Sequence, residues 1–300
     1  MRLRAPDADD APAVLAVIVA RDIADLGIPD LTLEDLREEW GVSELDLAAD
    51  ARIAESDGGG IVGYAIVRDR GTLAVVAPER EGEGTGTRLL RWAEGRERER
   101  GRPLHRQWVA ASNASGRALL LAAGYEFVRS YWRLVRELDG FRDRVAVPAG
   151  MRLRALEVAR DARALHELDA ASFATVAAYE PESFVAFSEE HLRAHDLDPE
   201  LSCVAEHKGQ IVGFLLARRW QSENAGYVDL LAVHPSHQRR GLGSALLLGA
   251  FARFAAAGLR EAQLGVASDN ARALQLYERV GMRARFQVDT YERAVPDRRG

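Results

Sequence analysis

Apolar and polar residues along the chain follow two spacings. Apolar runs of strand length, such as residues 227–233, alternate with longer stretches in which alanine and leucine recur at the three- and four-residue spacing of a helix. Each half of the chain shows the same order: a short strand, two helices, a strand-turn-strand hairpin, a strand that enters a helix through a glycine-bearing turn, another strand, a short helix and a final aromatic strand. This order predicts a mixed α/β fold with a sheet flanked by helices.

The expected elements have these positions. We expect helices over residues 8–20, 33–40, 160–170 and 182–195, with Thr32 as the N-cap of the second. Hairpins are expected at 51–68 and 202–219, and final strands at 131–138 and 286–292.

The two halves also share sequence. The string Met-Arg-Leu-Arg-Ala begins at Met1 and again at Met151, an offset of 150 residues, and after the hairpins Pro78 matches Pro235 at an offset of 157. The difference places seven extra residues in a longer hairpin around residues 220–226. Matches in one order at a near-constant offset predict two copies of one fold. We expect domains at 1–138 and 151–295, joined by a linker at 139–150.

Composition narrows the class of protein. With 300 residues, 47% hydrophobic and 29% charged, the chain reads as two soluble globular domains, and its net charge of −6 argues against nucleic acid as a partner. Cys203 is the only cysteine, which excludes an intrachain disulfide, fits a cytoplasmic location and is expected to be a core thiol. The N-terminus lacks the apolar run of a signal peptide, and Arg253 interrupts the longest apolar helix, so no membrane association is expected.

The turn after the strand at 227–233 carries the clearest chemistry. Gly241 and Gly243 allow backbone N–H groups to crowd at a helix N-terminus, and Arg239 and Arg240 add positive charge. Such a turn predicts a phosphate-binding site. A Walker loop is excluded because the only lysine, Lys208, lies elsewhere, and a dinucleotide fingerprint is excluded because position 246 is leucine.

The string Gln238-Arg-Arg-Gly241-Leu-Gly243, placed after Val-x-Pro, resembles the acetyl-coenzyme A loop of the GNAT family of N-acetyltransferases. The resemblance implies two tandem GNAT folds of the α/β (α+β) class, each a mixed, mostly antiparallel sheet flanked by helices. It also implies acetyl-CoA as co-substrate and no metal. The implied cofactor-binding residues are Leu231, Ala232, Val233, Gln238, Arg239, Arg240, Gly241, Leu242, Gly243, Ser244, Asn270 and Ala273.

A second string supports the same resemblance. Asn270 and Tyr277 are seven residues apart, so they share one helix face, and they match the GNAT pattern Asn-x-x-Ala-x-x-x-Tyr. In that family the asparagine contacts the pantetheine arm and the tyrosine protonates the leaving thiolate. Because the pKa values of an ordinary phenol and thiol are close, moving a proton from one to the other costs only about 2 kcal/mol of free energy, which permits this transfer. The alternative is that Tyr277 is a core aromatic residue.

The first copy has lost these features. Glu81, Gly82 and Glu83 stand where the second copy has Gln238, Arg239 and Arg240, and Leu120 stands where it has Tyr277. Carboxylates repel a diphosphate by about 1 kcal/mol in water and by more at lower dielectric. The retained glycines predict that the turn survives, but we expect a structural or vestigial domain, in which Arg80 and Arg88 could rescue only weak binding.

The general base is less clearly marked. Asp229 is the only acid in its strand and should share a face with Tyr227 and Leu231. It could be a base with a raised pKa, or it could hold a backbone or arginine contact near the splayed strands. In some relatives the acid lies two residues earlier in the strand. This chain has Tyr227 at that position, so the role of that acid cannot be transferred. Glu189, Glu190 and His191 lie in the helix that the resemblance places over the acceptor site, and we interpret them as a solvated helix face.

The sequence therefore predicts acetyl transfer from acetyl-CoA to a primary amine of a small molecule, by direct attack in the C-terminal domain. Backbone N–H groups at residues 231–233 would stabilise the reacting carbonyl. The two-copy layout is similar to that of the mycothiol synthases, which acetylate the cysteinyl amine of a sugar-linked thiol precursor. A non-catalytic acetyl-CoA sensor or scaffold, or a protein amine acetylase, remain alternatives, and the sequence carries no signal for the oligomeric state.

Overall fold

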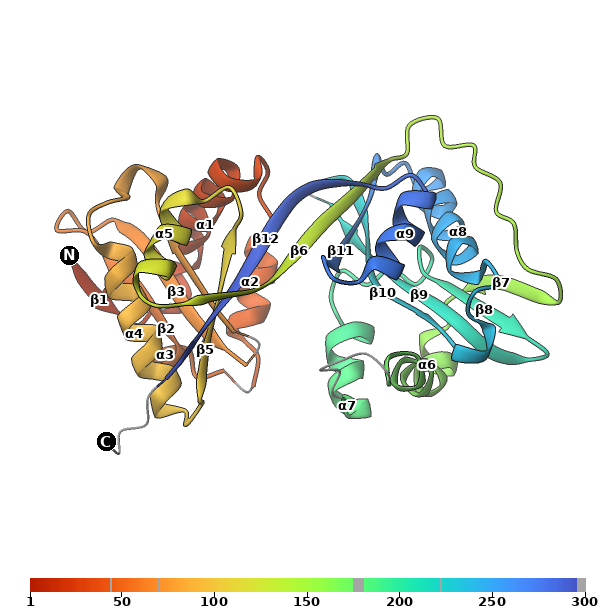
Figure 1. Cartoon of the computed structure of the whole chain (residues 1–300), viewed down its shortest axis with the longest axis horizontal. Helices are drawn as coiled ribbons and strands as arrows, with labels where there is room; N and C mark the ends of the chain where they lie inside the picture. The colour runs from red at the N-terminus through yellow and green to blue at the C-terminus, as the bar shows by residue number, and fades with distance from the viewer. Residues whose placement is uncertain (44, 70, 175–180, 222, 296–300) are drawn as a thin grey trace. The chain divides into compact units, whose positions relative to one another are not determined.

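The structure, a computed structural model, describes residues 1–43, 45–69, 71–174, 181–221 and 223–295. Its internal contacts divide the chain into two units, Met1–Tyr131 with Phe286–Gly300, and Trp132–Arg285. Each unit contains a sheet with helices on both faces (Figure 1). The two-copy, mixed α/β organisation predicted from the sequence is therefore confirmed.

The first unit begins with an edge strand and two helices. Its strand order is β1-β2-β3-β4-β5-β12-β6, antiparallel between β1 and β4 and parallel between β4 and β5. One apolar cluster lies under α1 and α2, and a second lies under α4. The elements are β1 (Arg2–Arg4), α1 (Ala11–Leu26), α2 (Leu33–Trp40), α3 (Leu47–Asp50), β2 (Ala51–Glu55), β3 (Ile61–Arg68), β4 (Gly71–Val76), α4 (Thr85–Glu99), β5 (Leu104–Ala110), α5 (Ala114–Ala122) and β6 (Glu126–Glu137).

The second unit repeats this plan. Its strand order is β6-β11-β10-β9-β8-β7, with a single parallel pair, β10–β11, among the registers described from β7 to β11. A large core lies under α8, and a smaller one lies under α6 and α7. The elements are β7 (Met151–Ala155), α6 (Val158–Phe173), α7 (Phe184–Phe187), a π-helical turn η3 (Ser188–Leu192), β8 (Cys203–His207), β9 (Gln210–Trp220), β10 (Ala225–Val233), α8 (Leu242–Ala256), β11 (Glu261–Ala267), α9 (Ala271–Arg279) and β12 (Arg283–Ala294).

The units differ from the expected domains 1–138 and 151–295 in their last strands. Residues 286–294 of β12 belong to the first unit, where Val288–Ala294 pair with β5 and Tyr291 packs in the core. The end of β6 belongs to the second unit, where Leu134 and Leu138 pack under α8. Neither strand contains glycine or proline. Each aromatic run therefore continues as one long strand, because no turn residue lets it fold back beside its own copy.

Local predictions had mixed outcomes. The Thr32 N-cap is confirmed, since its hydroxyl accepts from the Asp35 N–H in a reciprocal capping box. Cys203 is fully buried, as expected. The helix predicted over residues 182–195 is wrong in form, because four α-helical residues pass into the π turn that ends at Leu192. Among the described residues, no helix combines the length and apolar character needed to span a bilayer.

Candidate active site

The glycine-bearing turn joins β10 to α8 in the geometry expected of an anion site. After Val233 the chain makes a 3₁₀ turn at Pro235–His237, and the Gln238 amide donates to the Val233 carbonyl over 2.9 Å. Gly241 is the N-cap of α8 with φ of +84°, so the first N–H groups of a 15-residue helix face the turn. No heavy atom lies within 4 Å of the position that a Cβ on Gly241 would take, which leaves this approach open.

Arg239 has an unusual backbone for its residue type. Its φ is +60°, a left-handed conformation that costs a non-glycine L-residue about 1–2 kcal/mol. The first copy has Gly82 at the same point, with φ of +77°, and Gly84 matches Gly241 with φ of +80°. The prediction that the turn survives in the first copy is confirmed. The second copy keeps an arginine where glycine would be less strained, which indicates a use for its charge.

The charges of the two turns are arranged differently. Arg239 and Arg240 are exposed, and neither forms an ion pair with any residue that the structure describes. In the first unit, Glu81 pairs with Arg21, and Arg80 pairs with Glu83 over 2.7 Å. Among the described residues, the second turn itself therefore carries two arginines without an ion pair, whereas the arginine within the first turn is paired and Arg88, in the first part of α4, donates to the Met1 carbonyl.

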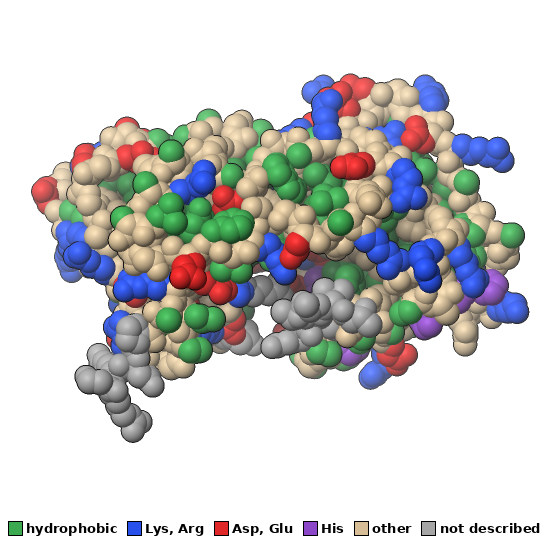
Figure 2. All heavy atoms as spheres, in the orientation of Figure 1, with side chains coloured by type: hydrophobic (Ala, Val, Ile, Leu, Met, Phe, Trp, Pro, Cys, Tyr) green, Lys and Arg blue, Asp and Glu red, His purple; other side chains and the backbone are tan. Residues whose placement is uncertain are grey.

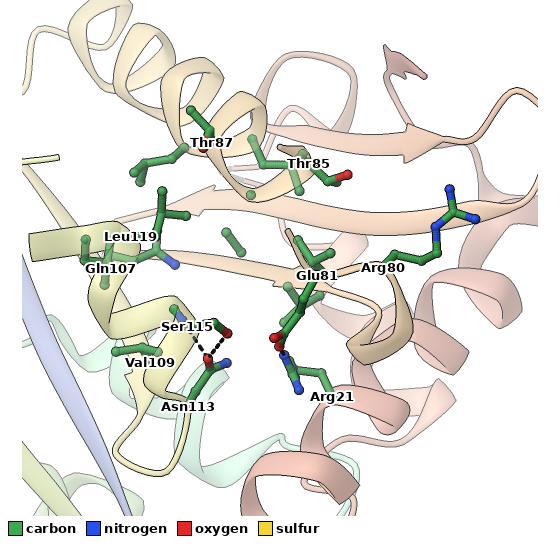
Figure 3. A pocket seen from close by; sticks show the side chains of 18 of the residues that line it. Arg21, Arg80, Glu81, Thr85, Thr87, Gln107, Val109, Asn113, Ser115 and Leu119 are labelled. Carbon is green, nitrogen blue, oxygen red and sulfur yellow. Dashed lines mark hydrogen bonds and ion pairs between the residues drawn. The ribbon is translucent and has the colours of Figure 1, made fainter. Parts of the chain in front are cut away.

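The first unit retains a cavity of about 330 Å³ beside its turn. Figure 3 shows the Glu81 side chain reaching the Arg21 guanidinium across this cavity. Arg21 also pairs with Asp25, which accepts from the Asn113 amide over 2.8 Å. A chain of polar contacts thus runs from Glu81 in the turn to Asn113, the N-cap of α5.

Strand β10 is irregular at Asp229. Val228 pairs with Ala217 and Leu230 with Leu216, so Asp229 is an unpaired bulge residue. Registered pairing with β11 runs from Ala225 only to Val228, and the strands separate beyond it. The bulge corrects one expectation, because Leu231 packs in the core under α8 whereas Asp229 faces η3. Residues 231–233 follow on the part of β10 that pairs with β9 but has no registered partner in β11.

Asp229 is held by two partners. Its Oδ1 lies 3.0 Å from Nε of Arg218, which also pairs with Asp196 over 3.1 Å. Its Oδ2 lies 2.7 Å from Nδ1 of His191. Burial alone would raise the pKa of the Asp229 carboxyl, but the hydrogen bond from His191 and the charge of Arg218 outweigh it and hold that pKa below its ordinary value. This agrees with the arginine-contact interpretation and not with a base of raised pKa.

His191 is the site residue that sequence reasoning missed. It was expected on a solvated face, but it is buried, with 9% of its surface exposed. In the π turn the ring faces the β10 bulge. A histidine and a strand acid 38 residues apart carried no signal of contact in the sequence.

Asn270 and Tyr277 lie at the two ends of α9. The Asn270 side chain caps the helix by accepting from the Ala273 N–H over 3.1 Å, and α8 packs close to α9 at Gly243, where a Cβ would lie 3.1 Å from the Leu276 side chain. Tyr277 is half-buried against the core under α8, and burial, followed by the nearby Tyr227, raises its pKa to about 12. Tyr277 is thus a weaker acid than an ordinary phenol, and full proton transfer to a thiolate becomes unfavourable by about 5 kcal/mol.

Comparison with known proteins agrees with this geometry. The model of the acetyltransferase (GNAT) family matches residues 162–282, which contain β10, the turn and α9. A protein named mycothiol acetyltransferase from Thermomonospora curvata is 35% identical over 230 residues, 74% of this chain and 73% of the relative. The chain belongs to the GNAT family of acetyltransferases. It is a transferase, and its family uses acetyl-CoA as co-substrate.

Solved GNAT structures extend the likeness to both units. A GCN5-related N-acetyltransferase from Sphaerobacter thermophilus has a TM-score of 0.83 and 27% identity, covering 99% of this chain and 96% of the other. A tandem GNAT protein from the clavulanic acid biosynthesis pathway has a TM-score of 0.76 at 17% identity, covering 98% and 99%. The tandem GNAT fold predicted from the sequence is therefore confirmed.

Three histidines lie at or beside the turn between β10 and α8. His237 contacts His207 over 3.3 Å, and its ring lies 5.9 Å from that of His234. In Figure 2 the histidine side chains in view lie on the second unit, with basic side chains close by. The surface around the turn therefore combines exposed arginine with a cluster of three histidine rings.

Proposed function

We propose that the second unit transfers an acetyl group from acetyl-CoA to a primary amine of a small molecule, and that the first unit is structural. The observation that carries the proposal is the contrast between the two turns. They share one backbone, yet only the second presents unpaired arginines, Arg239 and Arg240, to a diphosphate.

In this proposal the pyrophosphate lies against the N–H groups of Gly241, Leu242, Gly243 and Ser244, with Gln238 bracing the turn. The pantetheine arm runs along residues 231–233, where β10 has separated from β11, and passes Asn270 and Ala273. The free N–H groups of that strand segment would stabilise the oxyanion. Tyr277 donates a hydrogen bond to the sulfur as the carbon–sulfur bond breaks.

The acceptor class follows from the relatives that are named mycothiol acetyltransferases. The first compound to test is therefore the cysteinyl amine of the sugar-linked thiol precursor. No feature of the described acceptor region specifies the sugar, so the proposal is limited to a small-molecule primary amine.

Calorimetric titration with acetyl-CoA tests the proposal. The wild-type protein should bind at one site, and a variant with Arg239→Glu, Arg240→Glu and Gly241→Asp should bind none. Binding that persists in this variant would assign the cofactor to the first unit. If the wild type binds acetyl-CoA but releases no CoA with any primary amine, the transferase part of the proposal is wrong.

A further inference from the structure

A buried chain of charged groups connects the π turn to the bulge of β10. Asp196 pairs with Arg218, Arg218 with Asp229, and Asp229 with His191. We propose that His191 is the base that removes a proton from the acceptor ammonium, and that Asp229 positions it. This inference rests on the proposed function, since it assigns the base for that same reaction.

Asp229 is poorly suited to accept the proton itself. Both of its oxygens are engaged, one by Arg218 over 3.0 Å and the other by His191 over 2.7 Å. Protonating this carboxyl would leave Arg218 partly uncompensated in a buried position, which costs more free energy than the same change in water. His191, which contacts Asp229, is therefore the better candidate for the base.

The ring of His191 is oriented for this role. An ionised carboxylate only accepts hydrogen bonds, so Nδ1 of His191 carries the hydrogen that it donates to Asp229. In the neutral ring Nε2 is then an acceptor with an available lone pair. Nε2 lies 3.9 Å from Oε2 of Glu182, too far for a direct hydrogen bond. An ammonium group between these two atoms could donate to both.

The surrounding charges favour a strong base. The groups that face His191 are the carboxylates of Asp229 on β10, Glu190 on η3 and Glu182 before α7, with Arg218 behind Asp229. Burial alone would lower the pKa of His191, but the hydrogen bond and charge of Asp229 and the two glutamates together raise it. The glutamates would also attract a cationic acceptor. The Glu182 side chain is 32% exposed and that of His191 11%, and Oε2 of Glu182, the atom nearest Nε2, is itself buried.

Two local irregularities of the backbone bring His191 and Asp229 together. In η3 the Arg193 N–H bonds to the Ser188 carbonyl over 2.9 Å, the five-residue spacing of a π turn. The bulge at Asp229 aims that side chain at the same point. Asp229 also follows Tyr227 by two residues, and Tyr227 lies close enough to Tyr277 to raise its pKa. The candidate base and the candidate acid thus adjoin one short segment of β10.

The proton balance is as follows. The acceptor ammonium gives one proton to Nε2 of His191, which passes it to solvent. The resulting amine nitrogen attacks the thioester carbonyl carbon, a carbon–nitrogen bond forms, and the carbon–sulfur bond breaks. The second nitrogen proton is lost from the adduct and balances the proton that the departing CoA thiolate acquires with the help of Tyr277. The products are an N-acetyl amide, CoA thiol and one proton.

Steady-state kinetics over a range of pH test the assignment. The probe is S-methylcysteine amide with acetyl-CoA, because it lacks a thiol and released CoA can be followed with a thiol reagent. His191→Gln should lower kcat at least about 100-fold and abolish the rise of rate with pH, while the acetyl-CoA affinity stays unchanged. Asp229→Asn should shift that rise to lower pH and also lower kcat, because the uncharged amide no longer raises the pKa of His191.

His166→Gln is the matched control. His166 packs against the same Phe187 ring as His191 does, but it bonds to the Glu182 carbonyl oxygen and not to a carboxylate. It should keep the pH dependence of the wild type. Nitrogen-15 NMR of the histidine rings gives a second readout, in which Asp229→Asn lowers the pKa of His191.

Several outcomes would overturn the inference. Turnover in His191→Gln within about threefold of wild type, with the same pH dependence, would exclude His191 and leave the proposed function intact. Loss of turnover on chelation, restored by zinc, would assign His191 to a metal instead, since its ligand atoms and those of Glu182 and Glu190 lie within 4.8 Å. Failure of the wild type to bind acetyl-CoA would overturn the proposed function together with this inference.

Discussion

Replacing Arg239 by glycine should relieve the backbone strain of the turn and, separately, weaken the binding of acetyl-CoA. The left-handed backbone at Arg239 costs about 1–2 kcal/mol, and glycine removes this cost but adds about 0.5–1 kcal/mol of unfolded-state entropy. The net expectation is a gain of about 0.5–1 kcal/mol in the free energy of unfolding. For a unit of this size the melting temperature should rise by about 1–4 °C.

The same change should weaken cofactor binding. One positive charge at about 4 Å from a phosphate oxygen contributes about 1 kcal/mol in water, so the acetyl-CoA dissociation constant should rise at least about fivefold. Because the lost interaction is between exposed charges, the difference between variant and wild type should shrink as salt is raised. Thermal or urea unfolding measures the first effect, and calorimetry at two salt concentrations measures the second.

Lys208→Gly is the matched control. Lys208 is also left-handed, with φ of +51°, but it lies in the turn between β8 and β9. This variant should show a similar gain in stability with unchanged acetyl-CoA affinity. The reasoning fails if Arg239→Gly is no more stable than wild type, or if it binds acetyl-CoA within twofold of the wild-type affinity.

Four further predictions follow from individual contacts. Tyr277→Phe should lower kcat about 100-fold while calorimetry shows unchanged acetyl-CoA binding, and the wild-type rate should show no alkaline decline from this group below about pH 12, because the hydroxyl stays protonated up to its raised pKa. Gly226→Ala should destabilise the protein by about 1–3 kcal/mol in urea titrations, since its Cβ would lie 2.3 Å from the buried Phe254 ring, whereas Gly95→Ala in the open face of α4 should stabilise it by about 0.5–1 kcal/mol. A fragment of residues 1–138 should show no cooperative monomeric unfolding by circular dichroism and size-exclusion chromatography, because it lacks the β12 segment that pairs with β5; a stable monomer would contradict the strand assignment. Arg152 and Arg154 lower the pKa of Glu206 to about 2, so its stabilising effect is complete above the ordinary pKa of about 4.3 and is lost as pH falls towards 2; Glu206→Gln should remove this part of the acid dependence of unfolding, and an unchanged acid profile would argue against it.

The sequence was sufficient for features that local chemistry dictates. Gly241 and Gly84 stand where the backbone must be left-handed, so the turn could be recognised in both copies from glycine alone. Thr32 caps its helix because its side chain reaches the N–H group three residues on, whereas the cap of α9 is Asn270 and not Ser268 or Asp269, the residues that the sequence suggested. The proposed loss of the first anion site also followed from the exchange of Arg239 and Arg240 for Gly82 and Glu83.

Regular spacing was the limit of that reasoning. Period two placed Asp229 and Leu231 on one face, but a bulge separates them. His191 was expected on the solvated face of a regular helix, but a π turn brings it to Asp229. Neither irregularity leaves a mark in the residue types, since both arise from how the segments pack against their neighbours.

What the sequence alone determined is therefore the duplicated GNAT fold, the glycine-bearing turn and the acetyltransferase family. Each of these depends on residues close together along the chain or repeated at a fixed offset. Only the tertiary structure decided which copy each final strand joins and which histidine meets Asp229. Strand pairing and the packing of η3 on β10 are contacts between distant segments, and their free energy depends on the neighbours of each segment as well as on its own residues.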